Sequence, residues 1–157
     1  MGRRMGFARF EKILENLKRE LAFGAGTAVG GHKQIVENIT AARTLKEKDS
    51  GKVVTIDADS GAYDITLPAN ATTGWNCTFV YKDAHGSQDI DVVSATADTI
   101  QGVHVDASPT AITAADKVTF VGGTAVVGDS IVVQTIDGTS VYVVTYSGAN
   151  GGITSAG

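Results

Sequence analysis

The chain has 157 residues, of which 43% are hydrophobic and 19% are charged, a composition that is typical of a globular protein and argues against a disordered one. Its formal net charge of −4 at pH 7 argues against a general nucleic-acid-binding protein. The sequence has no run of about 18 apolar residues, so we expect no membrane span.

The charge changes sign part-way along the chain. Residues 1–48 contain ten Lys and Arg and five Glu, whereas residues 49–157 contain three Lys and twelve Asp. The pattern is helical before this point and β-rich after it. We therefore expect a basic N-terminal arm, residues 1–48, attached to one acidic domain, residues 49–157.

The arm begins with a predicted amphipathic helix over residues 7–22. Its apolar residues recur at steps of three and four, at Phe7, Phe10, Leu14, Leu17 and Leu21. Phe23-Gly24-Ala25-Gly26 ends the helix, because glycine adopts the left-handed cap conformation readily. A helix of about four turns is marginal in isolation, so its apolar side needs a partner.

Residues 24–34 predict a flexible joint, because two glycine pairs and small side chains give reach rather than structure. The segment lacks the Gly-Lys-Ser/Thr sequence of a phosphate-binding loop. Residues 35–45 alternate only weakly and predict either a strand or a short helix.

From Lys52 onward the hydrophobic pattern has a period of two, which predicts short strands bounded by turn residues. The expected strands are Val53–Asp57, Tyr63–Leu67, Cys77–Lys82, Ile90–Ser94, Val103–Val105, Val118–Val121, Ser130–Thr135 and Val141–Tyr146. Asp137-Gly138 predicts a hairpin between the last two. No crossover helices are visible, so the expected fold is all-β, an antiparallel β-sandwich or jelly roll with an N-terminal helical arm.

No residue pattern predicts catalysis or a metal site. The sequence from Asp57 to Gly61 resembles the start of a calcium loop, but glycine stands at the fifth position and Pro68 at the twelfth, where ligands are required. Asp89 and Asp91 share one side of a strand, where solvated acids are the commoner case. A weak cation site at a subunit interface stays open for either group.

The remaining chemistry-bearing residues are scattered. No metal-ligand spacing relates the histidines, which are His32, His85 and His104. Cys77 lies in an apolar run and is expected to be a small buried hydrophobe. Trp75 follows a turn glycine and is expected to fill the core or to anchor an interface. We take Trp75 and Tyr142 as candidate interface residues and expect no catalytic residue, metal or cofactor.

Five segments of the domain carry a resemblance to a known family. They are Asp-Ser-Gly-Lys-Val-Val (49–54), Tyr-Asp-Ile-Thr-Leu-Pro (63–68), Gly-Trp-Asn-Cys-Thr-Phe-Val-Tyr-Lys (74–82), Val-Gly-Asp-Ser-Ile-Val-Val (127–133) and Asp-Gly-Thr-Ser-Val-Tyr-Val-Val (137–144). Together they resemble a small β domain of tailed-bacteriophage structural proteins, found in head decoration (cement) proteins and in some fibre proteins. The resemblance covers about residues 49–148. It departs from the family at Tyr142, where the last strand often carries Trp.

The resemblance implies a virion protein on the outer surface of the capsid, usually a homotrimer seated at local threefold positions. Its partners would be the major capsid protein and further copies of itself. Residues 131–133 and 141–144 are apolar on both faces of their strands, which is more than one solvent-facing sandwich needs. A trimer interface would bury this surplus.

The leading hypothesis is therefore a capsid-stabilising decoration protein, which is not an enzyme and binds neither nucleic acid nor membrane. Its arm would lie in a groove between capsid subunits, with apolar residues in hollows and basic residues against acidic patches. The expected capsid-binding residues are Arg3, Arg4, Phe7, Arg9, Phe10, Lys12, Leu14, Leu17, Lys18 and Leu21.

The alternative is a head- or tail-fibre module that binds a host-surface glycan or receptor. Trp75, Tyr63 or Tyr81 would supply its aromatic platform. Against it, the predicted helix is short and lacks the heptads of a trimeric coiled coil. An enzyme is the weakest hypothesis, because no acid, base and nucleophile can be named together.

Overall fold

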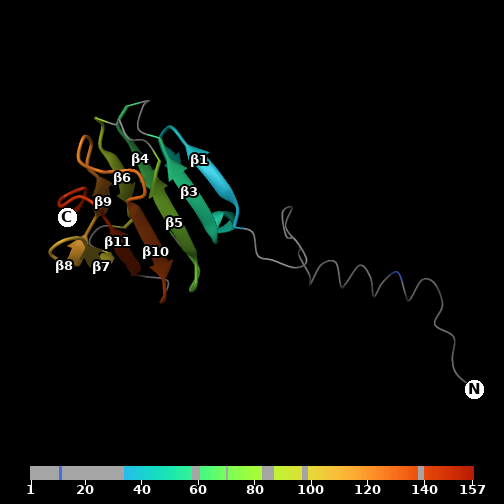
Figure 1. Ribbon diagram of the computed structural model, residues 1–157. Helices are drawn as coiled ribbons and strands as arrows, with labels where there is room; N and C mark the ends of the chain where they lie inside the picture. The colour runs from blue at the N-terminus through green and yellow to red at the C-terminus, as the bar shows by residue number, and fades with distance from the viewer. Residues whose placement is uncertain are drawn as a thin grey trace, which may run out of the picture. The chain divides into compact units, whose positions relative to one another are not determined.

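The computed structural model describes residues 11, 34–57, 61–69, 71–82, 87–96, 99–137 and 140–157. Its compact unit runs from Gln34 to Gly157 and consists of two facing β-sheets (Figure 1). The first has seven strands, in spatial order β1 (Val36–Ile39), β3 (Lys52–Ile56), β5 (Asn76–Tyr81), β10 (Ser130–Thr135), β11 (Val141–Tyr146), β7 (Ile100–Val105) and β8 (Thr110–Ala115). The second has five strands, in the order β12 (Ile153–Ala156), β9 (Lys117–Phe120), β6 (Ile90–Val93), β4 (Tyr63–Thr66) and β2 (Arg43–Thr44). The expectation of an all-β, sandwich-like fold is confirmed.

Both sheets are mixed, so the expectation of purely antiparallel pairing is wrong. β1, β3 and β5 run parallel in one sheet, and β2, β4 and β6 run parallel in the other. The chain passes from one sheet to the other at each of these strands, so the connection between two parallel neighbours is a strand of the opposite sheet. Parallel pairing needs a long connection, and here a strand fills the role usually taken by a helix. A jelly roll, which is built from antiparallel strands, does not describe this order.

The second half of the unit contains the predicted hairpin. β10 and β11 pair antiparallel in full register, from Ser130 opposite Tyr146 to Thr135 opposite Val141. β11 then pairs parallel with β7, which joins the hairpin to the remainder of the sheet.

The body begins earlier than the sequence indicated. Residues 34–48, which we assigned to the arm, supply β1, β2 and part of the short 3-10 helix η1 (Glu47–Asp49). Ile39 and Leu45 are buried in the core. These elements were hard to predict because β1 and β2 are only four and two residues long and contain mostly polar side chains.

The core fills the space between the two sheets with the inward side chains of alternating strands. Phe79 and Tyr81 of the first sheet and Ile65 and Phe120 of the second are fully buried. The rings of Tyr81 and Phe120 stack across the layers with centroids 5.6 Å apart. Within the portion of the chain that is described, no helix is long and apolar enough to cross a membrane.

Candidate interaction surface

The seven-stranded sheet turns alternate side chains away from the core, and its register aligns them in rows across the strands. One row crosses all seven strands, and we call it the central row. It consists of Val36, Val53, Thr78, Val132, Val144, Val103 and Ala111, from β1 to β8. Every member is apolar or a threonine, and Val132 is the middle one.

Two further rows flank the central row on the same side of the sheet. One consists of Asn38, Thr55, Val80, Ser130, Tyr146 and Val105. The other consists of Asn76, Gln134, Tyr142 and Gln101. No residue in the three rows is charged, and we call them together the uncharged face. Val36 is 64% exposed, Tyr146 is 50% exposed and Val132 is 36% exposed.

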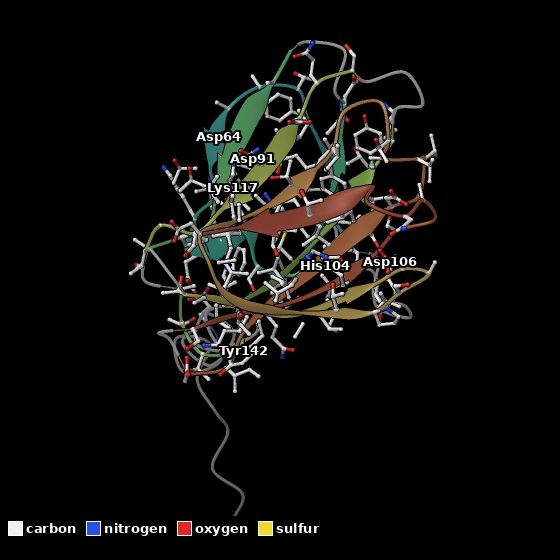
Figure 2. All side chains as sticks on the ribbon, turned by 90° about the vertical axis from the view of Figure 1, so that its left-hand side faces the viewer. Asp64, Asp91, His104, Asp106, Lys117 and Tyr142 are labelled. Carbon is white, nitrogen blue, oxygen red and sulfur yellow. The ribbon has the colours of Figure 1, made fainter. Side chains whose placement is uncertain are left out.

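The outer face of the five-stranded sheet is different in kind, because it carries charges. Asp64 and Asp91 lie opposite each other on neighbouring strands. Lys117 Nζ donates a hydrogen bond of 2.6 Å to Asp91 Oδ2, and this bond raises the pKa of Lys117. Figure 2 shows Asp64, Asp91 and Lys117 on one side of the ribbon and Tyr142 on the other. Such ion pairs are typical of a face that stays in water.

An open groove of about 400 Å³ lies next to the uncharged face. Its apolar walls are Val105, Val126, Val127 and Tyr146, all of which are partly exposed. An apolar hollow beside an uncharged sheet is the kind of place where an interface residue of a partner is anchored.

Asp129 fixes the loops that form this groove. Its buried carboxylate accepts hydrogen bonds from Val126 N at 3.0 Å, Ser147 Oγ at 2.9 Å and Gly148 N at 2.7 Å. These donors belong to the loops before β10 and after β11. Because the carboxylate is bonded on both oxygens, we interpret Asp129 as a structural residue rather than a catalytic one.

Four charged side chains form a cluster at the beginning of the body, and we call it the charged clasp: Glu37, Arg43, Asp49 and Lys52. Lys52 Nζ lies 2.5 Å from Asp49 Oδ1 and 2.9 Å from Glu37 Oε2. Arg43 binds Glu37 and lies 3.4 Å from Asp49 Oδ1. The clasp therefore ties β1, β2 and η1 to β3.

The electrostatics of the clasp keep all four groups charged. Burial alone would raise the pKa of Asp49, but hydrogen bonds from Lys52 and from the Lys46 N–H outweigh it, and the pKa of Asp49 is lowered. Hydrogen bonds from Arg43 and Lys52 lower the pKa of Glu37. The pKa of Lys52 is raised in return, chiefly by its bond to Asp49.

His104 connects the two sheets and is 8% exposed. Its Nδ1 lies 2.8 Å from Thr145 Oγ1 on β11, and its Nε2 lies 3.1 Å from Ser155 Oγ on β12. Burial lowers the pKa of His104, and the charge of Asp106 opposes this only in part. The neutral ring is thus satisfied at both nitrogens, which is typical of a core histidine.

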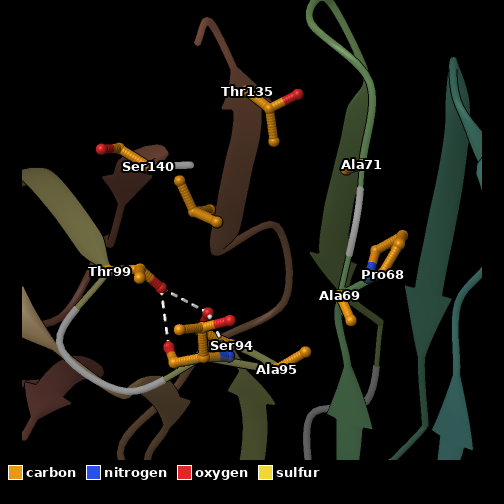
Figure 3. A pocket seen from close by; sticks show the side chains of 10 residues that line it. Pro68, Ala69, Ala71, Ser94, Ala95, Thr99, Thr135 and Ser140 are labelled. Atoms are coloured by element: carbon orange, nitrogen blue, oxygen red, sulfur yellow. Dashed lines mark hydrogen bonds between the residues drawn. The ribbon is translucent and has the colours of Figure 1, made fainter. Parts of the chain in front are cut away.

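A small cavity opens beside Ser94 and Thr99 at the end of the sandwich (Figure 3). The two hydroxyl oxygens lie 2.5 Å apart, and Thr99 Oγ1 also donates to Thr96 O at 2.7 Å. The cavity has a volume of about 20 Å³, which is enough for a water molecule but not for an organic ligand.

The structure separates the predicted functional residues into two groups. All ten expected capsid-binding residues of the arm lie outside the described residues. The helix predicted around them lies outside too, except for Glu11. His32, Asp59 and His85 also lie outside them. Tyr142 points outward on β11 as part of the uncharged face.

The aromatic residues expected to face a partner are mostly core residues. Trp75 is 1% exposed, so of its two expected roles it fills the core, and its assignment as a candidate interface residue is wrong. Tyr63 and Tyr81 are buried too, so the aromatic glycan platform expected from these three residues is wrong. Cys77 is buried, and burial raises the pKa of its thiol to about 12, which makes it an inert residue.

The candidate acids have structural partners. Asp89 Oδ1 accepts a hydrogen bond from Gly122 N at 2.8 Å, and Asp91 Oδ1 accepts one from Thr119 Oγ1 at 2.5 Å. Among the residues that the structure describes, no three His, Cys, Asp or Glu form a group that could hold a metal ion.

The uncharged face is the feature that sequence reasoning found only in part. The apolar surplus of β10 and β11 was visible, but the row that crosses seven strands depends on strand order and register. One sequence signal would have helped: the outward positions in these rows are Val, Thr, Tyr, Asn, Gln, Ser and Ala, although the domain is rich in Asp.

Comparison with known proteins finds no family model that matches this chain and no curated protein that matches it significantly.

Proposed function

We propose that this chain is a structural virion protein that decorates the outer surface of a phage head. The observation that carries the proposal is the uncharged face, which spans one whole sheet of an otherwise acidic body. A broad exposed surface without charge is typical of a subunit that acts by packing against other proteins. The resemblance of residues 49–148 to phage decoration domains supports the same function.

The arm is the part of the chain that would attach the protein to the shell. Its sequence combines an apolar stripe from Phe7 to Leu21 with basic residues such as Arg3, Arg9 and Lys18. The stripe would fill apolar hollows between subunits of the major capsid protein, and the basic residues would meet acidic patches on the shell. Several arms on one assembly would add avidity.

The mechanism is mechanical rather than chemical. A protein that binds two neighbouring capsid subunits favours the closed shell, because its binding free energy is lost when those subunits separate. The charged outer face of the five-stranded sheet, with Asp64, Asp91 and Lys117, would then remain toward solvent.

Quantitative mass spectrometry of purified particles tests the function. Hundreds of copies per particle would support decoration, a handful would favour a fibre, and none would contradict both. Adding purified protein to undecorated heads then tests the arm. A chain lacking residues 1–33 should fold but fail to co-sediment with heads, whereas retained binding would move attachment onto the β body.

The fibre alternative keeps one supporting observation. Tyr146 is half exposed beside the groove formed by Val105, Val126 and Val127, so it could stack against a sugar ring in place of the buried aromatic residues. Copy number separates this alternative from decoration. A glycan array with the wild-type chain and a Tyr146→Ala variant would test it directly.

A further inference from the structure

We infer that two copies of this chain associate face to face through the uncharged face, about a twofold axis that passes near Val132. This inference rests on the interaction surface used for the proposed function and names its occupant as a second copy of the chain. The arrangement differs from the threefold seating that the family resemblance implies.

Charge is the first reason for choosing a second copy. Residues 34–157 contain six Lys and Arg and fourteen Asp and Glu, so two bodies repel each other on most approaches. Contact through the five-stranded sheet would bring Asp64 and Asp91 of one copy toward those of the other. Contact through the uncharged face sets no like charges of the strands against each other.

The distribution of apolar residues is the reason for twofold symmetry. A threefold ring joins two different patches of each subunit, whereas a twofold dimer uses one patch twice. Of the two described sheets, one has an uncharged outer face. Its central row has Val132 in the middle and apolar side chains toward both ends. A half-turn about Val132 therefore brings apolar residues of one copy against apolar residues of the other.

The size of the face is adequate for a dimer. Seven strands of four to six residues cover about 600 Å² in projection, from the usual spacings of strands and residues. A standard interface buries roughly 800 Å² of accessible surface on each partner. A pleated face presents more accessible surface than its projection, and the groove beside Tyr146 adds to it. Two sheets would pack about 10 Å apart, as in a sandwich core.

Native mass spectrometry and sedimentation equilibrium of the full-length chain test the assembly. We expect a dimer that Val132→Asp converts to monomer, with at least a hundredfold weaker association. Val93→Asp is the matched control, because Val93 also points outward, on β6 between Thr66 and Lys117 of the other sheet. It should leave the dimer intact. A wild-type trimer or monomer, or a dimer that survives Val132→Asp, would overturn the inference.

Disulfide cross-linking provides a second measurement that does not depend on the folding of a charged variant. Val132→Cys should give a covalent dimer under mild oxidation, because the axis brings the two Cys side chains together. Val93→Cys should not, and neither should the wild-type chain, whose Cys77 is buried. Failure of Val132→Cys to cross-link in a chain that is dimeric would place the contact elsewhere and contradict the inference.

The outcomes also separate this inference from the proposed function. Particles that carry hundreds of copies of a monomeric or trimeric chain would retain the decoration function and remove the twofold dimer. A dimer that is cross-linked at position 132 but is absent from particles would do the opposite.

Discussion

At the scale of single residues, Asp49 is the most deeply buried member of the charged clasp. It is 1% exposed, and it accepts bonds from Lys52, Arg43 and the Lys46 N–H. Asp49→Ala should lower the free energy of unfolding by about 2–3 kcal/mol, because Lys52 and Arg43 lose the more deeply buried of the two carboxylates that they share. We place the loss below that of a fully buried pair, since Lys52 and Arg43 keep part of their surface in water. Urea denaturation measures it, and Asp64→Ala, on the exposed face, should change stability by less than about 0.5 kcal/mol.

The same clasp should make stability depend on pH. The pKa values of Asp49 and Glu37 are lower in the folded chain than in the unfolded chain. Their contribution is therefore complete above about pH 4.5, near the unfolded values, and is lost as the pH falls through the lowered folded values. The stability difference between the wild type and Asp49→Ala should shrink between pH 7 and pH 2.5. A difference that stays constant would mean that ionisation of Asp49 is not what stabilises the clasp.

His104 should give a second pH dependence at higher pH. Its pKa is lowered by burial, so the unfolded chain takes up a proton first as the pH falls below about 6.5. The stability contributed by the neutral ring is thus complete above that pH and decreases as the pH falls toward the folded value. Between pH 7.5 and pH 5.5 the wild type should lose up to about 1 kcal/mol more than His104→Gln. Equal losses, measured by urea denaturation at both pH values, would contradict a neutral buried ring.

At the scale of elements, the sequence predicted the strands whose apolar residues alternate clearly. β10 and β11 agree with the prediction in both bounds, and β3 to β6 and β9 agree to within a residue or so. β8 and β12 were missed because their residues are mainly Thr, Ala and Ser, which give little apolar alternation. Strand order could not be read at all, since a parallel neighbour is selected by the path of the chain across the opposite sheet.

The candidate site was predictable to the same extent: features within one strand could be read from the sequence, whereas relations between strands could not. The sequence indicated the apolar surplus of β10 and β11, and Tyr142 was among its candidate interface residues. The central row needed the register of seven strands, which local pattern does not encode. Two roles were expected for Trp75 because a turn before a strand can direct a side chain toward either side of the sheet. The structure places it in the core.

Gly102 shows how close β7 and β11 approach. A Cβ atom on Gly102 would lie 1.8 Å from the backbone oxygen of Val143, so no rotamer change can relieve the clash. Gly102→Ala should cost about 3 kcal/mol or more, measured by thermal or urea unfolding. Gly51→Ala is the control: its Cβ meets nothing within 4 Å, and only the positive φ of +78° is unfavourable, at about 1 kcal/mol. Equal costs for the two variants would contradict the close approach.

At the scale of the whole molecule, the inner faces of the two sheets form the core, and their outer faces differ in charge. Their inner faces share one apolar core, while the outer face of one sheet is uncharged and that of the other holds ion pairs. The early strands alternate between the two sheets, so consecutive strands of the chain lie on opposite sides of the core. The uncharged face combines early and late strands of the body, with β1 at one edge of the sheet, β10 in the middle and β8 at the other edge.

The true start of the body yields the last prediction. A chain that begins at Gln34 should fold, whereas one that begins at Asp49 should lose most of its stability. The shorter chain lacks buried Ile39 and Leu45, uncovers the edge of β3 and removes two members of the clasp. Deleting a buried aliphatic side chain alone costs about 2–5 kcal/mol, so the combined loss approaches the whole stability of an ordinary domain. Circular dichroism with urea denaturation measures both chains. A cooperative transition at the same urea concentration in each would mean that residues 34–48 do not belong to the folding unit.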